Sequence, residues 1–382
     1  MKRVLRSLLI IILIAAMVTG IIPCDYSEAK IENEMSESTF WIKFIDVKQG
    51  DAALIQCDGH YMLIDGGPSS ASSVIYAILK RDKIKVLDYM IATHPDADHI
   101  GGLSGALNYA KANVCYSPVT THDTKTFDSL LKYLDKRGGT LLVPEAGTSF
   151  ELGSAKVEML GPVKEGDSTN NMSIVTKITY GKTSFLFMGD AEISEEKSLM
   201  SAKSDLSCDL LKVSHHGSKG ATSTKFLKKA KPQFAVISVG ADNPYGHPTA
   251  ETLKRLKKAK VSVFRTDLQG DIVCYSDGVN LSFTTKKDTP EESIWNPGEL
   301  PKDPAIIEGL IIPTDDVEDI PDGTTFVINK NSNKFHLLTC DSVKDIAPKN
   351  KAYSNASVEE LTEAGYKPCG GCKPADKNRK NE

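Results

Sequence analysis

The stretch THPDADHIGG, residues 93–102, places His94, Asp96, Asp98 and His99 within six positions. On an open surface these carboxylates would repel one another and gain no partner. A divalent cation removes that cost, because imidazole nitrogen and carboxylate oxygen are its usual ligands. The spacing therefore predicts a metal site. The alternative is a turn in which Asp96 or Asp98 caps the following helix, which would explain one aspartate and leave both histidines without a role.

Further residues of the same types follow other apolar runs. FLFMGDAE places Asp190 after one such run, LLKVSHHGS places His215 and His216 after the next, and ISVGADNPYGHP places His247 after a third. Functional residues are commonly carried by loops that a rigid scaffold positions. A single histidine would be explained as a structural residue, but five of the eight histidines follow strand-like runs in this way. The pattern therefore predicts a two-metal centre assembled from several strand ends.

The elements that must position these residues extend from residue 40 to about residue 283. Apolar runs of strand length, such as FWIKFIDV, AALIQC, TSFLFMGD and FAVISVG, alternate with amphipathic helical stretches such as SSVIYAILKRDK and ETLKRLKKAK. Strands mixed with helices over a segment of this length predict an α/β domain whose sheets are covered by helices. We assign this domain to residues 38–286.

Seven stretches between residues 44 and 272 follow one another in the order FIDVKQGDAALI, LIDGG, THPDADHIGGL, MGDAE, LLKVSHHGS, ISVGADNPYGHP and RTDLQGDI. Together they resemble the metallo-β-lactamase fold of metal-dependent hydrolases, and in particular the extracellular hydrolase domain of ComEC-type competence proteins. The resemblance implies an αββα sandwich, with two divalent ions at the edge between its sheets. The metal ligands that it implies are His94, Asp96, Asp98, His99, Asp190, His215 and His247.

In this resemblance Asp190 bridges the two ions, and Asp98 and His215 are the expected catalytic residues. His215 is either a ligand or a proton donor near the leaving group. The chain departs from the family's common pattern at Asp96, where histidine is usual, and at residues 170–171, where asparagines occupy the region of another usual histidine. One metal site is thus richer in oxygen, which favours harder ions, so zinc and manganese are both expected metals. A smaller departure is Lys48, where glycine is usual.

A second group of metal-type ligands lies near the C-terminus. Three residues separate His336 from Cys340, and Cys369 and Cys372 form a CxxC knuckle. Two close pairs of such ligands, with no open position, are typical of a structural zinc site. Residues 324–382 are also too few to bury a large core, so a bound metal ion or a disulfide is expected to stabilise them. The segment resembles the metal-binding module of Ada-type proteins, whose expected ligand here is DNA or a cell-surface component. The alternative is a disulfide from Cys340 to one knuckle cysteine.

The N-terminal residues 1–29 begin with basic residues, continue with an apolar run from residue 8 to residue 22, and end in a Ser-Glu-Ala sequence that suits cleavage. The apolar run is shorter than the roughly 20 residues that a membrane span needs, so it predicts a secretory signal peptide. We therefore expect a secreted, extracellular protein. Retention of the uncleaved segment, which would associate the protein with the cell surface, is the alternative.

Charge is distributed unevenly along the chain. Residues 288–322 hold eleven acidic residues and one basic residue, so this stretch carries −10, whereas the whole chain carries −4. The other residues therefore carry +6, which suits a polyanionic substrate. We interpret residues 287–323, which are rich in acid and proline, as a linker. Lys212 and Lys219 flank the SHHGS motif and are expected to support the substrate.

The expected chemistry is hydrolysis of a phosphodiester. A bound divalent ion supplies hydroxide at neutral pH, and two ions can clamp a phosphoryl group. The sequence therefore predicts a secreted, metal-dependent phosphodiesterase, a nuclease that acts on DNA. Two alternatives stay open because a fold does not determine a function. One is a hydrolase of another small ester or lactone, and the other is a binding protein that keeps its metals without turnover.

Overall fold

The computed structural model of this protein describes residues 39–163, 166–241, 243–298, 310–311, 326–347, 350–354, 358–363 and 366–374. The chain divides into two compact units, on either side of residue 300. The predicted signal peptide lies outside the described residues. Within the ranges given above, no helix is both long enough and apolar enough to cross a membrane.

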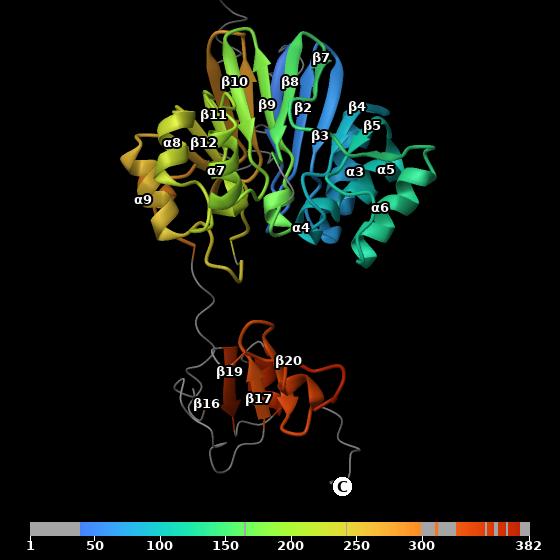
Figure 1. The fold of residues 1–382 in the computed structure, drawn as a ribbon, viewed down its shortest axis with the longest axis vertical. Helices are drawn as coiled ribbons and strands as arrows, with labels where there is room; N and C mark the ends of the chain where they lie inside the picture. The colour runs from blue at the N-terminus through green and yellow to red at the C-terminus, as the bar shows by residue number, and fades with distance from the viewer. Residues whose placement is uncertain are drawn as a thin grey trace, which may run out of the picture. The chain divides into compact units, whose positions relative to one another are not determined.

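Two β-sheets form the centre of the first unit (Figure 1). The strand order of the first sheet is β15 (Leu281–Thr285), β14 (Ile272–Ser276), β1 (Phe40–Phe44), β2 (Ala53–Cys57), β3 (His60–Ile64), β4 (Val86–Ile91), β5 (Lys111–Tyr116) and β6 (Leu141–Leu142). The order of the second sheet is β13 (Ser262–Arg265), β12 (Phe234–Ile237), β11 (Leu210–Lys212), β10 (Thr183–Phe187), β9 (Val175–Tyr180), β8 (Ala155–Gly161) and β7 (Ser149–Leu152).

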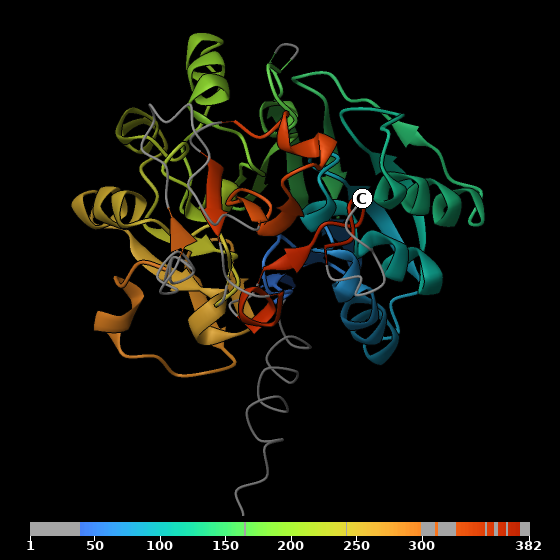
Figure 2. The same ribbon diagram turned by 90° about the horizontal axis from the view of Figure 1, so that it is seen from below.

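Helices cover the outer face of each sheet. The first sheet is covered by α3 (Ser72–Arg81), α5 (Leu103–Tyr109) and α6 (Lys125–Asp135), and the second by α7 (Ile193–Ser201), α8 (Thr224–Ala230) and α9 (Ala250–Lys258). Shorter helices are η1 (Ser69–Ala71), α4 (Ala97–Ile100), η2 (Asn170–Met172), η3 (Ser214–Gly217), α10 (Thr266–Gln269) and α11 (Glu291–Ile294). Figure 2 shows the teal and blue helices on one side and the yellow helices on the other. The predicted αββα sandwich is confirmed.

Strand β14 shows how the sequence builds the layers of the core. Ile272 and Cys274 belong to the core between the two sheets, whereas Val273 and Tyr275 belong to the core beneath the helices of the first sheet. Successive side chains of a strand point to opposite faces, so a strand covered on both faces is apolar throughout. Burial of each large apolar side chain contributes about 1.5–3 kcal/mol, and these layers therefore set where the strands end.

The cysteines of the first unit are part of this core. Cys57, Cys115, Cys208 and Cys274 are buried free thiols. Burial raises the pKa of Cys115 and of Cys208 to about 12, so neither thiol ionises near neutral pH. These four cysteines therefore act as small core residues.

Parallel pairing gathers the predicted ligands at one edge of the unit. Strands β3, β4 and β5 run parallel to one another, and so do β10, β11, β12 and β13. Ligands of open α/β sheets bind outside the carboxyl ends of such strands. The loops after β4, β10, β11 and β12 carry the histidines and aspartates singled out in the sequence. Two distant parts of the chain therefore contribute to one site.

The beginning of the predicted linker packs on the first unit. Helix α11 and the residues after it lie against the layer formed by α9, where Ile294 is buried and the Trp295 ring contacts the same apolar cluster. Three residues after Trp295, the Gly298 N–H donates a 2.9 Å hydrogen bond to the Pro248 carbonyl. Residues up to 298 therefore form part of the first unit.

The second unit is a small sheet. Its strand order is β16 (Leu310–Ile311), β19 (Lys351–Ser354), β17 (Phe326–Asn329), β18 (Lys334–Leu337) and β20 (Lys367–Pro368), accompanied by η4 (Asp341–Val343) and α12 (Val358–Glu363). Its core consists of Phe326, Ile328, Phe335, Ala352, Leu361 and Tyr366. An apolar core of six residues is small for an independent unit.

Candidate metal centre

The side chains of four histidines converge on the carboxylate of Asp190, which follows β10. His99 Nε2 lies 3.3 Å from Asp190 Oδ1. The Nε2 atoms of His216, His215 and His94 lie 3.6, 3.7 and 3.9 Å from Asp190 Oδ2. Two ligand atoms that share an ion, each about 2.1 Å from it, lie about 3–3.5 Å apart. The geometry fits a carboxylate shared between two ions.

The converging atoms lack hydrogen-bond partners. Nε2 of His94, His99 and His216 and Oδ1 of Asp190 are buried, and none of them makes a hydrogen bond. A buried polar atom without a partner costs about 1–3 kcal/mol, so four such atoms facing one another are costly unless another group satisfies them. Divalent metal ions would satisfy these atoms, and the residues present therefore fit the ions that the sequence predicts.

The two aspartates of the first motif lie on the solvent side of this group. Asp98 Oδ2 is 3.3 Å from His216 Nε2, and Asp96 Oδ2 is 3.7 Å from His94 Nε2. The two side chains are 34% and 37% exposed, so substrate could reach the ions beside them. Two sets of ligand atoms each lie within 4.8 Å of one another: His94, His99 and Asp190, and Asp98, His99 and His216.

Two buried carboxylates without an assigned role hold the far side of these histidines. Asp65, directly after β3, places Oδ2 2.8 Å from His99 Nδ1. Asp51 Oδ1 lies 3.2 Å from His216 Nδ1, which makes its hydrogen bond, at 2.9 Å, with the Ser238 carbonyl. A carboxylate behind a ligating imidazole fixes the ring's tautomer and orientation. Both aspartates belong to motifs that carry the family resemblance, FIDVKQGDAALI and LIDGG. Their place in these motifs could have identified them from the sequence.

Lys212 is not available to a substrate. Its side chain is buried at the end of β11, where Nζ lies 2.7 Å from Asp51 Oδ2 and donates a 2.9 Å hydrogen bond to the Val213 carbonyl. The expectation that Lys212 supports the substrate was therefore wrong, because its charge is used inside the protein. Lys219 is exposed and keeps that predicted role.

The buried histidines His94 and His216 have pKa shifts in opposite directions. Burial lowers the pKa of His94 to about 4, and the neighbouring His99 adds to this effect. Burial also acts to lower the pKa of His216, but Asp190 and Asp51 outweigh it and raise that pKa to about 10. The Asp190 carboxylate stays ionised. Burial acts to raise its pKa, but His99 and His216 hold that pKa well below its usual value.

The charges of the centre match two divalent cations. The carboxylates are those of Asp51, Asp65, Asp96, Asp98 and Asp190, and the only ammonium paired with this group among the described residues is that of Lys212. With neutral imidazoles the group carries four negative charges. Buried charge is tolerated only when it is paired, and two divalent cations would supply that compensation.

His215 and His247 lie at the rim of the centre. His215 is 23% exposed, and its Nδ1 lies 3.5 Å from Glu192 Oε1. The His247 ring is centred 5.5 Å from the ring of His215 and 6.5 Å from that of His216, and its Nδ1 has no hydrogen-bond partner. Among the described residues, neither histidine belongs to a set of three mutually close ligand atoms. The structure thus places His216, which had no assigned role, deeper than these two predicted ligands.

Residues 45–241 match the Metallo-beta-lactamase superfamily. The chain belongs to this superfamily. It therefore has the fold of a metal-dependent hydrolase.

Three curated relatives match the chain over similar shares of its length. It is 30% identical to ComE operon protein 3 of Bacillus subtilis (strain 168), over 67% of this chain and 35% of that protein. It is 32% identical to Recombination protein 2 of Haemophilus influenzae, over 63% and 29%, and 26% identical to Competence protein ComA of Neisseria gonorrhoeae, over 64% and 32%. The chain spans about a third of the length of these relatives. The resemblance to competence proteins is confirmed.

The departures from the superfamily's usual motifs have visible consequences. Asn171 donates from Nδ2 to Asp167 Oδ1 and Ser168 Oγ, at 2.6 and 3.1 Å, and its Oδ1 accepts the Glu192 N–H at 3.0 Å. It therefore holds its own loop and offers no ligand in place of the missing histidine. Lys48 has φ +67°, a conformation that costs a residue with a side chain about 1–2 kcal/mol, which explains the usual glycine.

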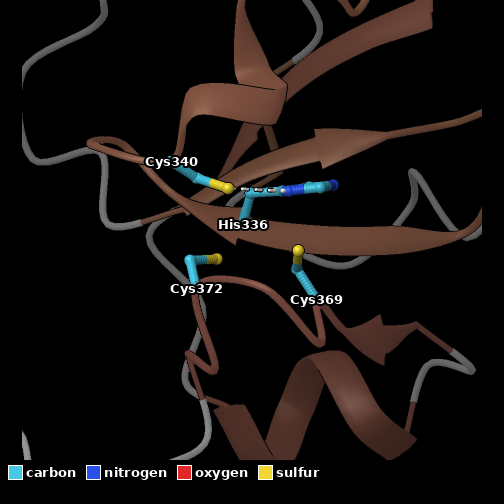
Figure 3. A group of neighbouring side chains, drawn as sticks. All are labelled: His336, Cys340, Cys369 and Cys372. Atoms are coloured by element: carbon cyan, nitrogen blue, oxygen red, sulfur yellow. Dashed lines mark hydrogen bonds between the residues drawn. The ribbon is translucent and has the colours of Figure 1, made fainter.

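The second unit has its own group of ligands. His336, on β18, places Nδ1 3.5 Å from Cys340 Sγ, and its buried Nε2 has no hydrogen-bond partner. Figure 3 shows Cys369 and Cys372 reaching toward this pair from the knuckle that follows β20. Ligand atoms of all four residues lie within 4.8 Å of one another. The arrangement fits a closed site of four ligands.

Proposed function

We propose that this protein is a two-metal phosphodiesterase that cleaves DNA outside the cell. The observation that carries the proposal is the buried Asp190 carboxylate, which four imidazoles approach at 3.3–3.9 Å from two sides. Bound divalent ions would supply hydroxide at neutral pH and would stabilise charge on the phosphoryl oxygens.

The residues divide into two ligand sets that share Asp190. His94 and Asp96 would hold one ion, with His215 as ligand or proton donor. Asp98, His99 and His216 would hold the other, with His247 as a further ligand. Asp98 and His215 face the solvent side and are the residues that act on the substrate. Because one set is rich in oxygen, manganese is as suitable as zinc.

DNA is the substrate that the charges and the relatives favour together. The matched relatives are named as competence and recombination proteins. Lys219 lies exposed three residues after the inner His216, where a phosphate backbone would pass. A hydrolase of a small ester or lactone and a non-catalytic metal-binding protein are the alternatives, and the experiment below separates them.

The second unit and the N-terminus complete the proposal. His336, Cys340, Cys369 and Cys372 hold one structural zinc, and the module of residues 324–382 binds DNA or a cell-surface component. Residues 1–29 act as a signal peptide that exports the chain. Of the predicted linker, residues 299–309 connect the two units, since residues 310–311 form β16 in the sheet of the second unit.

The test uses the full chain with added manganese or zinc. End-labelled single- and double-stranded DNA, bis(4-nitrophenyl) phosphate and a lactone are supplied in parallel. We expect metal-dependent cleavage of DNA, and a loss of about a thousandfold or more in Asp190→Asn. Asp82→Asn, at the C-terminal end of α3, where Asp82 pairs with Arg81 away from the candidate ligands, is the matched control. Cleavage of the lactone alone would establish the small-ester alternative, and no turnover by metal-loaded protein would establish the binding alternative.

A further inference from the structure

Tyr245 presents its ring to solvent beside the metal centre. Its side chain is 59% exposed, and it is the one aromatic residue among the large apolar side chains that the described part of the chain exposes strongly. A single exposed apolar residue needs no explanation by itself. The place of this ring and the way its loop is held both indicate a use.

The ring lies at the rim where the substrate would enter. Its centroid is 5.7 Å from that of His247, and the two ring planes are inclined by 27°. The His247 ring is in turn centred 6.5 Å from that of His216. Nε2 of His216 lies 3.3 Å from Asp98 Oδ2. A flat molecule stacked on Tyr245 would therefore lie next to the metal-binding carboxylates.

One buried side chain fixes the loop that carries the ring. Asn243 Oδ1 accepts the N–H groups of Tyr245 and His247 at 3.1 and 3.0 Å. Its Nδ2 donates to the Gly240 and His247 carbonyls at 2.8 and 2.6 Å. Four hydrogen bonds from one residue that is 3% exposed hold the turn in a single shape.

The far end of the loop is fixed as well. The Thr249 N–H donates to the Gly217 carbonyl at 3.0 Å, and the Gly298 N–H donates to the Pro248 carbonyl at 2.9 Å. A ring that is already fixed loses little freedom when a ligand binds, and a tyrosine offers a large flat contact for that reason. The loop thus presents a preorganised aromatic surface at the entrance of the centre.

We propose that Tyr245 is a stacking platform for an unpaired base next to the scissile phosphodiester, so that the substrate is single-stranded nucleic acid or a frayed end. The inference rests on the proposed nuclease function. A base inside a duplex has both faces covered by its neighbours and cannot stack on Tyr245. Stacking of one base on an aromatic side chain changes binding by about 5- to 150-fold and tolerates any sequence, because every base has a flat face.

The experiment measures KM and kcat of the full chain, loaded with metal, on two matched single strands. One is a normal oligonucleotide, and the other carries abasic residues around the same scissile position. We expect Tyr245→Ala to raise KM for the normal strand by about 5- to 150-fold with little change in kcat, and Tyr245→Phe to stay within about twofold of the wild type. The wild type should already show a raised KM on the abasic strand, where Tyr245→Ala adds nothing.

Val279→Ala, which removes an equally exposed apolar side chain from the turn between β14 and β15, is the control and should change neither constant. Metal content is measured in every variant. A loss of metal in Tyr245→Ala would mean that the ring supports His247, and this would contradict the proposal that it stacks on a base. An unchanged KM for the normal strand in Tyr245→Ala would also overturn it, as would equal losses on the normal and abasic strands. Each of these three results would leave the proposed function intact. A wild type that cleaves no nucleic acid would contradict both proposals.

Discussion

The carboxylate behind His99 affects how well that histidine would meet a metal ion. Asp65 Oδ2 lies 2.8 Å from His99 Nδ1 and also accepts the Thr93 hydroxyl at 2.7 Å, so it is fixed in place while it orients the ring. Replacing it with asparagine keeps the shape and removes the charge. We expect Asp65→Asn to weaken metal binding by about 10- to 100-fold, measured by competition with a chelator.

A matched control exists within the same sheet. Asp88 Oδ2 lies 3.3 Å from His60 Nδ1, but that histidine is 54% exposed and is not among the candidate metal ligands. Asp88→Asn removes the same kind of pair without touching the centre, and metal affinity should be unchanged. Equal losses in the two variants would show that Asp65 acts on the fold and not on His99.

The raised pKa of His216, about 10, predicts how metal binding responds to pH. In the metal-free protein this ring is protonated at pH 7, and an ion must displace the proton. Metal affinity should therefore fall as the pH falls. The linkage to stability has the opposite sign: protonated His216 stabilises the metal-free fold fully below about pH 6.5, and this contribution is lost as the pH rises toward 10. Calorimetry in two buffers of different ionisation heat measures the released protons, and His216→Gln should release fewer than the wild type.

At the scale of the elements, the strap formed by α11 and residues 295–298 supports the rim. Arg265, at the end of β13, donates to the carbonyls of Ile294 and Asn296 and so anchors the strap. Gly298 then lies so close to the loop that a Cβ atom would overlap the His247 carbonyl oxygen. We expect Gly298→Ala to lower the free energy of unfolding by about 1–3 kcal/mol and to weaken metal binding, measured by denaturant unfolding and metal titration.

Gly220→Ala is the control for this prediction, because a Cβ atom there meets no heavy atom closer than 3.6 Å. Gly220 also follows the SHHGS motif closely in the sequence. The two variants therefore differ mainly in whether the added Cβ atom would overlap a neighbouring atom. If Gly298→Ala binds metal like the wild type, the strap only covers apolar surface and His247 is held by Asn243 alone.

The strand ends could be predicted from the sequence, but the contacts across them could not. Apolar runs followed by His and Asp locate the edge of each sheet, because strand period and loop chemistry are local properties. The partner of each ring is not local: Asp51 meets His216 only when the two sheets pack face to face. For the same reason Lys212 looked exposed in the sequence, whereas packing turns it toward Asp51.

Across the molecule as a whole, the two candidate metal sites differ in how far apart in the sequence their ligands lie. The second unit's ligands come from one short hairpin and one knuckle, so the CxxC spacing was enough to predict that they meet. The candidate metal centre of the first unit draws on loops from residue 51 to residue 247, and only the complete sandwich brings them together. Removal of metal should therefore affect the two units differently.

We expect the second unit to depend on a bound metal for folding, because the core formed by its described residues is small and four candidate ligands lie close together. Burial raises the pKa of the Cys372 thiol to about 11, so a bound zinc must displace protons and acid will release it. We expect Cys369→Ser to lower the zinc content by one ion, counted by native mass spectrometry, and to unfold the second unit while cleavage of bis(4-nitrophenyl) phosphate by the first unit continues. Asp341→Asn, an exposed change beside Cys340, should keep the ion. A wild type that holds no zinc there and shows a two-proton mass loss would instead establish the disulfide.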